Sequence, residues 1–258
     1  NYSSLIKDEK INLEEKIDNM IDSKHEFVHA NGITAAQLDK MEEKSFFDNK
    51  LVIIDEVHNL INGMASGGSM RALGLEKLFM DAKNLKLVFL SGTPMKNIPF
   101  EIGKTFNILR GFIHIDQFEI SKKKGKLDFN DLKNLLHSHP RLDQVSIKAK
   151  DKIVKITQNP FGFITSADNV GLVKGDNSET GFYIEIKKLL EANDYDIKTH
   201  KNYKTTLFPN ENKHFMNMFY DRVNNNIVDK NIFKRRIMGM VSFYSSAKKE
   251  LIPEIKIR

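Results

Sequence analysis

Leu51-Val52-Ile53-Ile54-Asp55-Glu56-Val57-His58 is the stretch that decides the fold. Four apolar residues run directly into two adjacent carboxylates. An unbroken apolar run of this length is typical of a strand buried on both faces of a parallel sheet. Ligands bind at the carboxyl ends of such strands, where Asp55 and Glu56 would emerge. The alternative is a strand that ends in a solvated acidic turn, and these two acids alone do not decide between the two readings.

A second apolar strand is expected at 85–90, and it ends in Ser91-Gly92-Thr93-Pro94. Apolar residues between the strands recur at helical spacing, which predicts a helix over 70–84. A strand, helix and second parallel strand form a crossover that brings both polar turns to one edge of the sheet. The Gly- and Ser-rich segment 62–69 is expected to be a flexible connection.

The two polar turns resemble motifs II and III of the superfamily 2 helicases. The continuation over 94–97 and 101–109 is similar to the Swi/Snf-type branch of that superfamily. The wider sequence resembles the helicase-like ATPases of nucleocytoplasmic large DNA viruses, which include the poxvirus transcription ATPases. The segments that carry this likeness are 47–50, 159–162 and 235–244, and it extends from about residue 26 to the end.

The resemblance implies an α/β fold with a partial RecA-like parallel-sheet lobe. It also implies that Asp55 holds Mg²⁺ through water, while Glu56 orients and deprotonates the water that attacks ATP. His58 would contact the second strand at Ser91, Gly92 and Thr93, and so couple the nucleotide state to the nucleic-acid state. The alternatives are a helix-start histidine that bonds to the backbone, and ordinary turn hydroxyls at Ser91 and Thr93.

No Gly-x-x-x-x-Gly-Lys-Ser/Thr phosphate-binding loop occurs in the 258 residues. In the resembling family that loop precedes motif II. We therefore expect a central piece of a longer ATP- and Mg²⁺-dependent helicase or translocase, which is inactive as this piece alone. The alternatives are a non-hydrolysing nucleic-acid-binding module and a structural subunit of a transcription complex. The intact pair of Asp55 and Glu56 argues against lost hydrolysis.

Composition bounds the partners. The net charge of +6 and a pI near 9.2 favour an anionic partner, for which DNA or RNA is the usual candidate. The absence of cysteine excludes disulfides, thiolate zinc sites and a cysteine nucleophile. No apolar run approaches the length of a membrane span. The resemblance adds viral RNA polymerase or transcription factors as partners, and an intracellular location in a viral factory of the host cytoplasm or in the virion.

The remaining elements suggest three domains. Residues 1–112 would form the partial first RecA-like lobe, 113–225 an inserted α+β unit, and 226–258 the beginning of a second lobe. Within the insert, the expected order is strand, helix, strand, strand, helix, strand, as in a ferredoxin-like unit. Its predicted elements are 113–120, 129–136, 141–149, 152–158, 182–192 and 196–207. Before the first lobe's strands we expect a helix at 11–21, a strand at 26–30, and a helix that Thr34 caps with Gln37.

Two basic groups are candidates for contact with a phosphate backbone. They are Lys122, Lys123, Lys124 and Lys126 in a turn, and the pair Arg235 and Arg236. The alternative is that such charge runs are solvated loops. His137 and His139 are too poor in nearby ligands for a metal site, because no carboxylate lies at ligand spacing.

Overall fold

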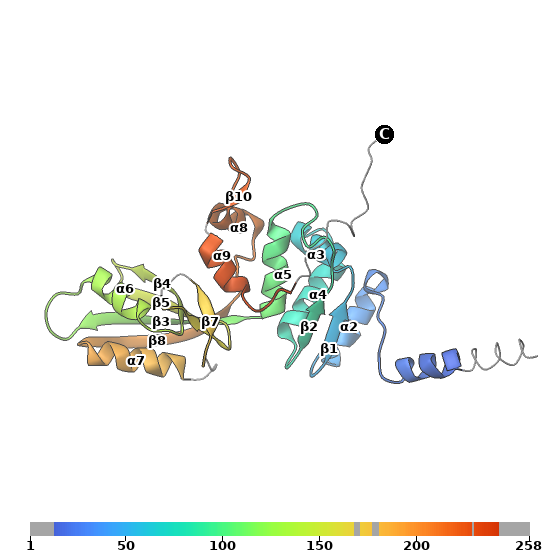
Figure 1. Ribbon diagram of the computed structural model, residues 1–258, viewed down its shortest axis with the longest axis horizontal. Coiled ribbons are helices and arrows are strands. Elements are labelled where there is room, and N and C mark those ends of the chain that lie inside the picture. The colour runs from blue at the N-terminus through green and yellow to red at the C-terminus, as the bar shows by residue number, and fades with distance from the viewer. Residues whose placement is uncertain (1–12, 168–170, 177–180, 229, 243–258) are drawn as a thin grey trace, which may run out of the picture. The chain divides into compact units, whose positions relative to one another are not determined.

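The computed structural model describes residues 13–167, 171–176, 181–228 and 230–242 (Figure 1). The chain divides into two compact units, 1–46 and 47–258, which are described separately. No helix in these described ranges is both long enough and apolar enough to cross a membrane.

The described part of the first unit, residues 13–46, contains two α-helices. Residues 13–22 are helical, so the helix expected at 11–21 is confirmed where the structure describes it. Helix α2 spans Ala35–Glu43, and its predicted cap is confirmed. The Gln37 backbone N–H donates to Thr34 Oγ1 over 3.3 Å, and the Thr34 backbone N–H donates to Gln37 Oε1 over 2.9 Å. These reciprocal bonds satisfy two amides that the helix itself leaves without a partner.

The strand expected at 26–30 is wrong. These residues form no strand, and a single 3-10 turn, η1, follows over Ala30–Gly32. A strand is stabilised by pairing, and no strand lies in the described part of this unit to pair with it.

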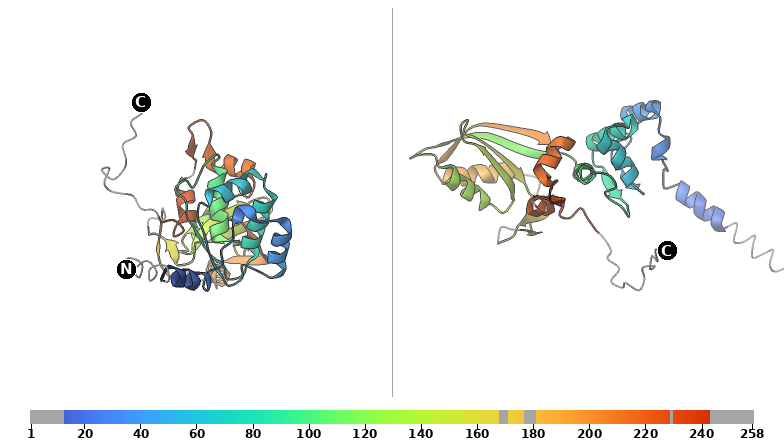
Figure 2. Two further views of the ribbon diagram at one scale, coloured as in Figure 1. Left: turned by 90° about the vertical axis from the view of Figure 1, so that its right-hand side faces the viewer. Right: turned by 90° about the horizontal axis from the view of Figure 1, so that it is seen from above.

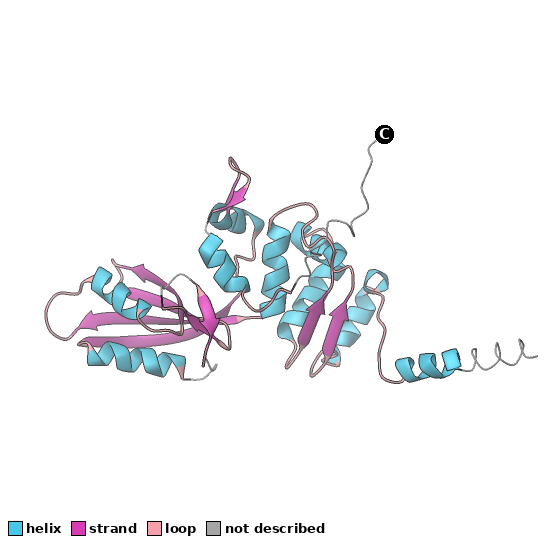
Figure 3. Cartoon of the chain, viewed as in Figure 1, coloured by secondary structure: helices cyan, strands magenta, loops and turns pink. Residues whose placement is uncertain are grey.

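The second unit begins with the predicted parallel pair. Strand β1, Leu51–Ile54, pairs in parallel with β2, Lys86–Phe89, and Ile54 lies opposite Phe89 (Figure 3). The expectation that both faces are buried is wrong. Leu51 and Ile53 are 61% and 60% exposed, while Val52 and Ile54 are half-buried. Only one face of this two-stranded sheet is covered by the described residues.

Two helices connect these strands. Helix α3 spans His58–Ser66 and α4 spans Met70–Asp81, so the segment 62–69 is mostly helical instead of a flexible connection. The helical spacing of the buried residues Ile61, Met64 and Ala65 outweighs the glycine content. Gly63 serves close packing, because a Cβ there would lie 3.0 Å from the Cβ of Ala72.

Helix α5, Phe100–Arg110, packs in an aromatic cluster with α8, Asn212–Phe219, and α9, Lys230–Ile237. A short hairpin of β9, Tyr220–Asp221, and β10, Asn226–Ile227, lies between α8 and α9. The buried rings are Phe100, Phe106, Phe208, Phe215, Phe219 and Phe233. Helix α8 lies within the range 113–225 predicted for the insert, but it packs with α5. The domain boundaries at 112 and 225 stay predictions.

Replacing Gly103 by Ala is expected to destabilise the second unit by about 1–3 kcal/mol through overpacking. A Cβ at Gly103 would lie 2.6 Å from Cε2 of Phe215, and the neighbouring rings of Phe100, Phe208 and Phe219 hold Phe215 in place. Denaturant unfolding measures the change. Combining the substitution with Phe215→Leu should cost less than the two separate losses added together, and simple additivity would contradict the clash.

The antiparallel sheet contains β3, Ile113–Lys122, β4, Leu142–Lys148, β5, Ile153–Gln158, and β8, Tyr195–Thr205. Its strand order is β4-β5-β3-β8, and every neighbouring pair is antiparallel. Helix α6, Phe129–His137, follows β3, and helix α7, Phe182–Ala192, precedes β8. The predicted order of strand, helix, strand, strand, helix, strand is confirmed. The hairpin of β6, Phe163–Thr165, and β7, Leu172–Lys174, was not predicted.

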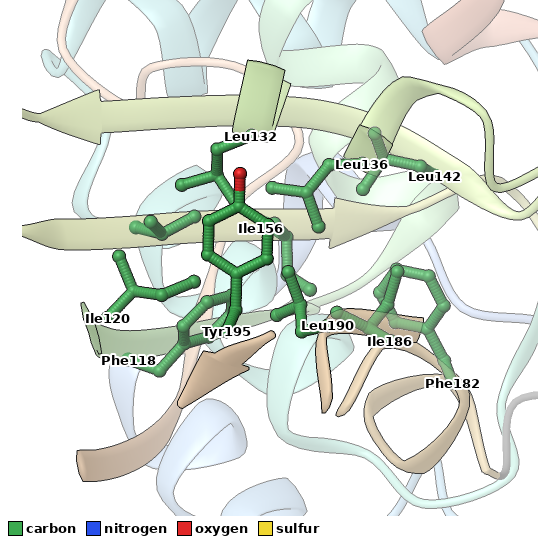
Figure 4. Packing of buried hydrophobic residues seen from close by; sticks show 11 residues of the cluster. Phe118, Ile120, Leu132, Leu136, Leu142, Ile156, Phe182, Ile186, Leu190 and Tyr195 are labelled. Carbon is green, nitrogen blue, oxygen red and sulfur yellow. The ribbon is translucent and has the colours of Figure 1, made fainter. Parts of the chain in front are cut away.

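The core of this sheet lies on one face. Phe118 and Ile120 of β3 are buried against Leu132 of α6 and Ile186 of α7, as Figure 4 shows. Both helices therefore cover the same face, and the view from above in Figure 2 shows them on one side of the strands. These two helices do not cover the other face of the sheet, where Arg236 of α9 reaches Gln144 and Thr157 is buried.

Candidate active site at the ends of the parallel strands

Asp55 and Glu56 lie in the turn that follows β1, and both are exposed. Backbone hydrogen bonds continue past the strand ends and hold this turn against β2. The Leu90 N–H donates to Ile54 O over 2.9 Å, and the Val57 N–H donates to Leu90 O over 3.2 Å. The end of β2 thereby positions the acidic turn, as expected for parallel strands whose carboxyl ends share one edge.

Glu56 adopts an unusual backbone conformation. Its φ is +49°, a region that residues other than glycine rarely occupy, at a cost on the order of 1–3 kcal/mol. The Glu56 N–H donates to Asp55 Oδ1 over 2.9 Å, which stabilises this turn. The side chain is 64% exposed, and its Oε2 lies 3.1 Å from His58 Nδ1. The left-handed turn places this carboxylate beside the histidine.

His58 joins the two polar turns. Its Nδ1 lies 3.1 Å from Ser91 Oγ, so the predicted contact between the turns is present. Ser91 Oγ also accepts a hydrogen bond from the Thr93 N–H over 3.1 Å, which shapes the second turn. His58 begins α3, but its ring bonds to these side chains instead of to the backbone. A Cβ at Gly92 would meet no atom within 4 Å, so no contact in the structure requires glycine there.

The donor set fits a water-mediated magnesium site. Asp55 uses Oδ1 for the Glu56 N–H, and both carboxylates are open to solvent. Mg²⁺ retains several of its waters and takes one or two carboxylates, which this arrangement allows. No group of three or more acidic or histidine side chains in the described ranges is arranged to enclose a metal ion. A metal at Asp55 would therefore need ligands from water and substrate.

Glu101 was not predicted as a site residue, although it organises the loop after Thr93. Its carboxylate is buried at 1% exposure and accepts hydrogen bonds from the backbone N–H groups of Lys96, Asn97 and Ile98. A buried carboxylate with several backbone donors holds a loop in one conformation. The signal in the sequence was an acidic residue in the first turn of a helix that follows Pro99.

The lysine run lies on the antiparallel sheet, not at the ends of β1 and β2. Lys122 is the last residue of β3, and its Nζ packs 4.0 Å from the centre of the Tyr195 ring. Lys123, Lys124 and Lys126 are exposed in the turn that follows. These three remain available to an anionic partner.

Arg235 and Arg236 point into the protein, which corrects the expectation that they contact phosphates. Arg236 is buried and donates to Leu207 O over 2.5 Å and to Gln144 Oε1. Burial lowers the pKa of the Arg236 guanidinium, and the nearby Asp143 carboxylate opposes that shift. Arg235 donates to three oxygens at 3.2–3.3 Å, which are Leu142 O, Asn159 Oδ1 and Thr165 Oγ1. The two arginines thus hold α9 against the antiparallel sheet.

Part of the chain is similar in sequence to proteins of several viruses. Over 74 residues it is 39% identical to a protein of African swine fever virus named Termination factor NPH-I homolog, a match that covers 26% of this chain and 10% of the relative. Over 85 residues it is 39% identical to a protein of Acanthamoeba polyphaga mimivirus named as an ATP-dependent RNA helicase, covering 32% and 7%. Over 75 residues it is 35% identical to a helicase-named protein of Invertebrate iridescent virus 3, covering 29% and 8%.

These matches show that the chain is related to helicase-like ATPases of large DNA viruses, as its two motifs predicted. The chain covers a tenth or less of the length of each of these relatives. No family model and no solved structure matches it.

Proposed function

We propose that this relative of the viral helicase-like ATPases is the central part of a superfamily 2 helicase or translocase that couples ATP hydrolysis to movement on DNA or RNA. In this proposal β1 and β2 belong to a partial RecA-like lobe. The observation that carries it is the 3.1 Å contact of His58 Nδ1 with Ser91 Oγ. This contact joins the acidic turn after β1 to the hydroxyl turn after β2, so two motifs far apart in the sequence form one site.

The two carboxylates have separate tasks in this proposal. Asp55 would hold Mg²⁺ through water, and Glu56 would orient the attacking water and accept its proton. Bound Mg²⁺ neutralises charge that develops on the phosphate oxygens. Glu56 is placed to act as a base because its carboxylate is solvent-exposed at the end of β1, where it can meet a water molecule.

His58 is assigned to coupling. Its Nδ1 faces Glu56 Oε2 on one side and Ser91 Oγ on the other, both at 3.1 Å. A ring nitrogen that carries one hydrogen can donate fully to only one of these acceptors at a time. A change at Glu56 during hydrolysis can therefore be passed to Ser91, and from its Oγ to the backbone of Thr93. Gly92 would allow that turn to move because glycine has a wider range of backbone conformations than other residues.

The conformation of Glu56 favours an enzyme over the alternatives, a non-hydrolysing binding module and a structural subunit. A left-handed glutamate costs free energy, and such strain persists where surrounding structure maintains it, often at active sites. A module that kept only the fold would need neither carboxylate, whereas Asp55 and Glu56 are both present. The proposed partners are nucleic acid and, by resemblance, the viral transcription machinery, with viral transcription as the step served.

The 258-residue chain alone is expected to show no Mg²⁺-dependent ATP hydrolysis, because its sequence contains no phosphate-binding loop. The intact protein that includes such a loop should hydrolyse ATP with Mg²⁺ and should do so faster with DNA or RNA. A phosphate-release assay on both proteins measures this. Hydrolysis by the chain alone would contradict the missing phosphate site, and an intact protein that nucleic acid does not stimulate would contradict the helicase function.

A further inference from the structure

The face of the antiparallel sheet that is turned away from α6 and α7 carries several lysines and a tyrosine. We call it the open sheet face and define it by the side chains that point away from α6 and α7. Those that matter here are Gln117, Ser146, Lys148, Lys155, Lys201 and Tyr203. The strand register aligns Ser146, Lys155, Gln117 and Lys201 in one row across all four strands. Residues buried by the two helices alternate with these positions along β3 and β5.

Three lysines cross this face. Lys155 on β5 and Lys201 on β8 flank β3, so their backbones are about 10 Å apart at the usual strand spacing. Lys148 lies on β4 at the outer edge and is exposed, as is Lys201. The carboxylates on the same face are Glu119, Asp196 at its far end, and the buried Asp143, which accepts from Thr157 and lies near Arg236.

An aromatic ring lies among these cations. Tyr203 is half-buried on β8, and Lys155 Nζ lies 5.5 Å from the centre of its ring. A lysine over a ring is a favourable contact in itself. The same pair brings together a ring of the kind that stacks on bases and a charge of the kind that contacts a phosphate.

The basic turn extends this surface. The turn after β3 is bonded to the turn before β8, because the Lys123 N–H donates to Asp194 O, and the turn between β4 and β5 is bonded to β3, because the Ile120 N–H donates to Lys152 O. The exposed lysines of these loops are Lys123, Lys124, Lys126, Lys150 and Lys152. These lysines would lie beside a nucleic-acid strand that left the open sheet face at this end.

We propose that the open sheet face binds a single strand of DNA or RNA, with a base stacked on Tyr203 and the phosphates beside Lys155, Lys201 and Lys148. This inference rests on the proposed function, because it names a surface for its nucleic-acid partner. A single strand fits better than a duplex, since paired bases are stacked on each other and cannot stack on a side chain. A sheet face with a ring and spaced cations is a surface on which unpaired nucleotides bind.

The test uses the absence of tryptophan from the chain. Tyr203→Trp places a single tryptophan on the open sheet face, and oligo-dT or oligo-U should quench its fluorescence, whereas a duplex should not. Tyr183→Trp on α7 is the matched reporter on the helix-covered side and should not respond. Tyr203→Ala should weaken single-strand binding about 5-fold or more, the loss expected for one stacked base.

The charge contribution is tested separately. The double variant Lys155→Ala with Lys201→Ala should lower the slope of log affinity against log salt by about 1 to 2. The control removes the same charge from α7, as Lys187→Ala with Lys188→Ala, and should leave the slope unchanged. Circular dichroism and unfolding curves establish that each variant is folded.

The fluorescence and binding measurements together decide whether the open sheet face binds a single strand. Quenching at residue 203 with weaker binding in both sets of open-face variants supports it. Binding that neither open-face set alters would overturn it, and so would equal quenching by a duplex. A chain that binds no single strand would also overturn it. None of these outcomes contradicts the proposed ATPase function, because Mg²⁺-dependent hydrolysis by the intact protein tests that function independently.

Discussion

Glu56→Gln in the intact enzyme is expected to lower the rate of ATP hydrolysis about 100-fold or more, the loss typical of a removed general base. Glutamine keeps the size and one acceptor oxygen of Glu56 but cannot accept the proton of the attacking water. Binding of ATP should persist, because Asp55 and the phosphate-binding loop are unchanged. Single-turnover hydrolysis and nucleotide-binding measurements on the same preparation separate these two effects.

The control for this substitution makes the same chemical change elsewhere. Glu191→Gln removes a carboxylate from the exposed side of α7, where Glu191 lies 3.8 Å from Lys187. Its hydrolysis rate should equal that of the unaltered enzyme. If Glu56→Gln also leaves the steady-state rate unchanged, Glu56 is not the base, and its left-handed conformation needs another explanation.

The parallel pair and its polar ends were predictable, whereas the exposure of the pair was not. Apolar runs that end in polar turns indicate both the strands and the edge where they meet. The same runs do not indicate what covers them, which is why Ile53 was expected to be buried and is 60% exposed. The helical segment after His58 was missed for a related reason. The glycine at 63 suggests flexibility, but the structure shows that it allows α3 to pack closely against Ala72 of the next helix.

The antiparallel sheet was predicted in order because each of its main strands and helices carries its own periodicity. Residues whose role depends on partners far away in the sequence could not be predicted in this way. Arg236 donates to Gln144, 92 positions earlier in the chain, and nothing near Arg236 in the sequence marks that contact. Glu101 shows the intermediate case. Its position in a helix start was visible, but the three backbone donors it organises became evident only from the folded loop.

The geometry of His58 leads to the second large effect. Its Nδ1 lies 3.1 Å from two side-chain oxygens, one at Glu56 in the proposed hydrolysis site and one at Ser91 on the second turn. Protonation or displacement of the Glu56 carboxylate during a catalytic cycle would alter whether the His58 ring bonds to Glu56 or to Ser91. Coupling between two binding sites is reciprocal, so nucleic acid that shifts the Ser91 turn should alter the hydrolysis site as well.

His58→Ala in the intact enzyme should therefore leave basal ATP hydrolysis within a few-fold of normal and largely abolish its stimulation by nucleic acid. The acids remain in place, because backbone bonds from Leu90 and Val57 hold their turn. Ser91→Ala removes the other end of the same contact and should reproduce this loss without touching Glu56. The assay compares hydrolysis with and without DNA and RNA, beside strand displacement per ATP consumed.

If basal and stimulated rates fall by the same factor, His58 belongs to the hydrolysis site or the fold, and the coupling role is wrong. If Ser91→Ala keeps full stimulation while His58→Ala loses it, the signal leaves His58 by a contact other than Ser91.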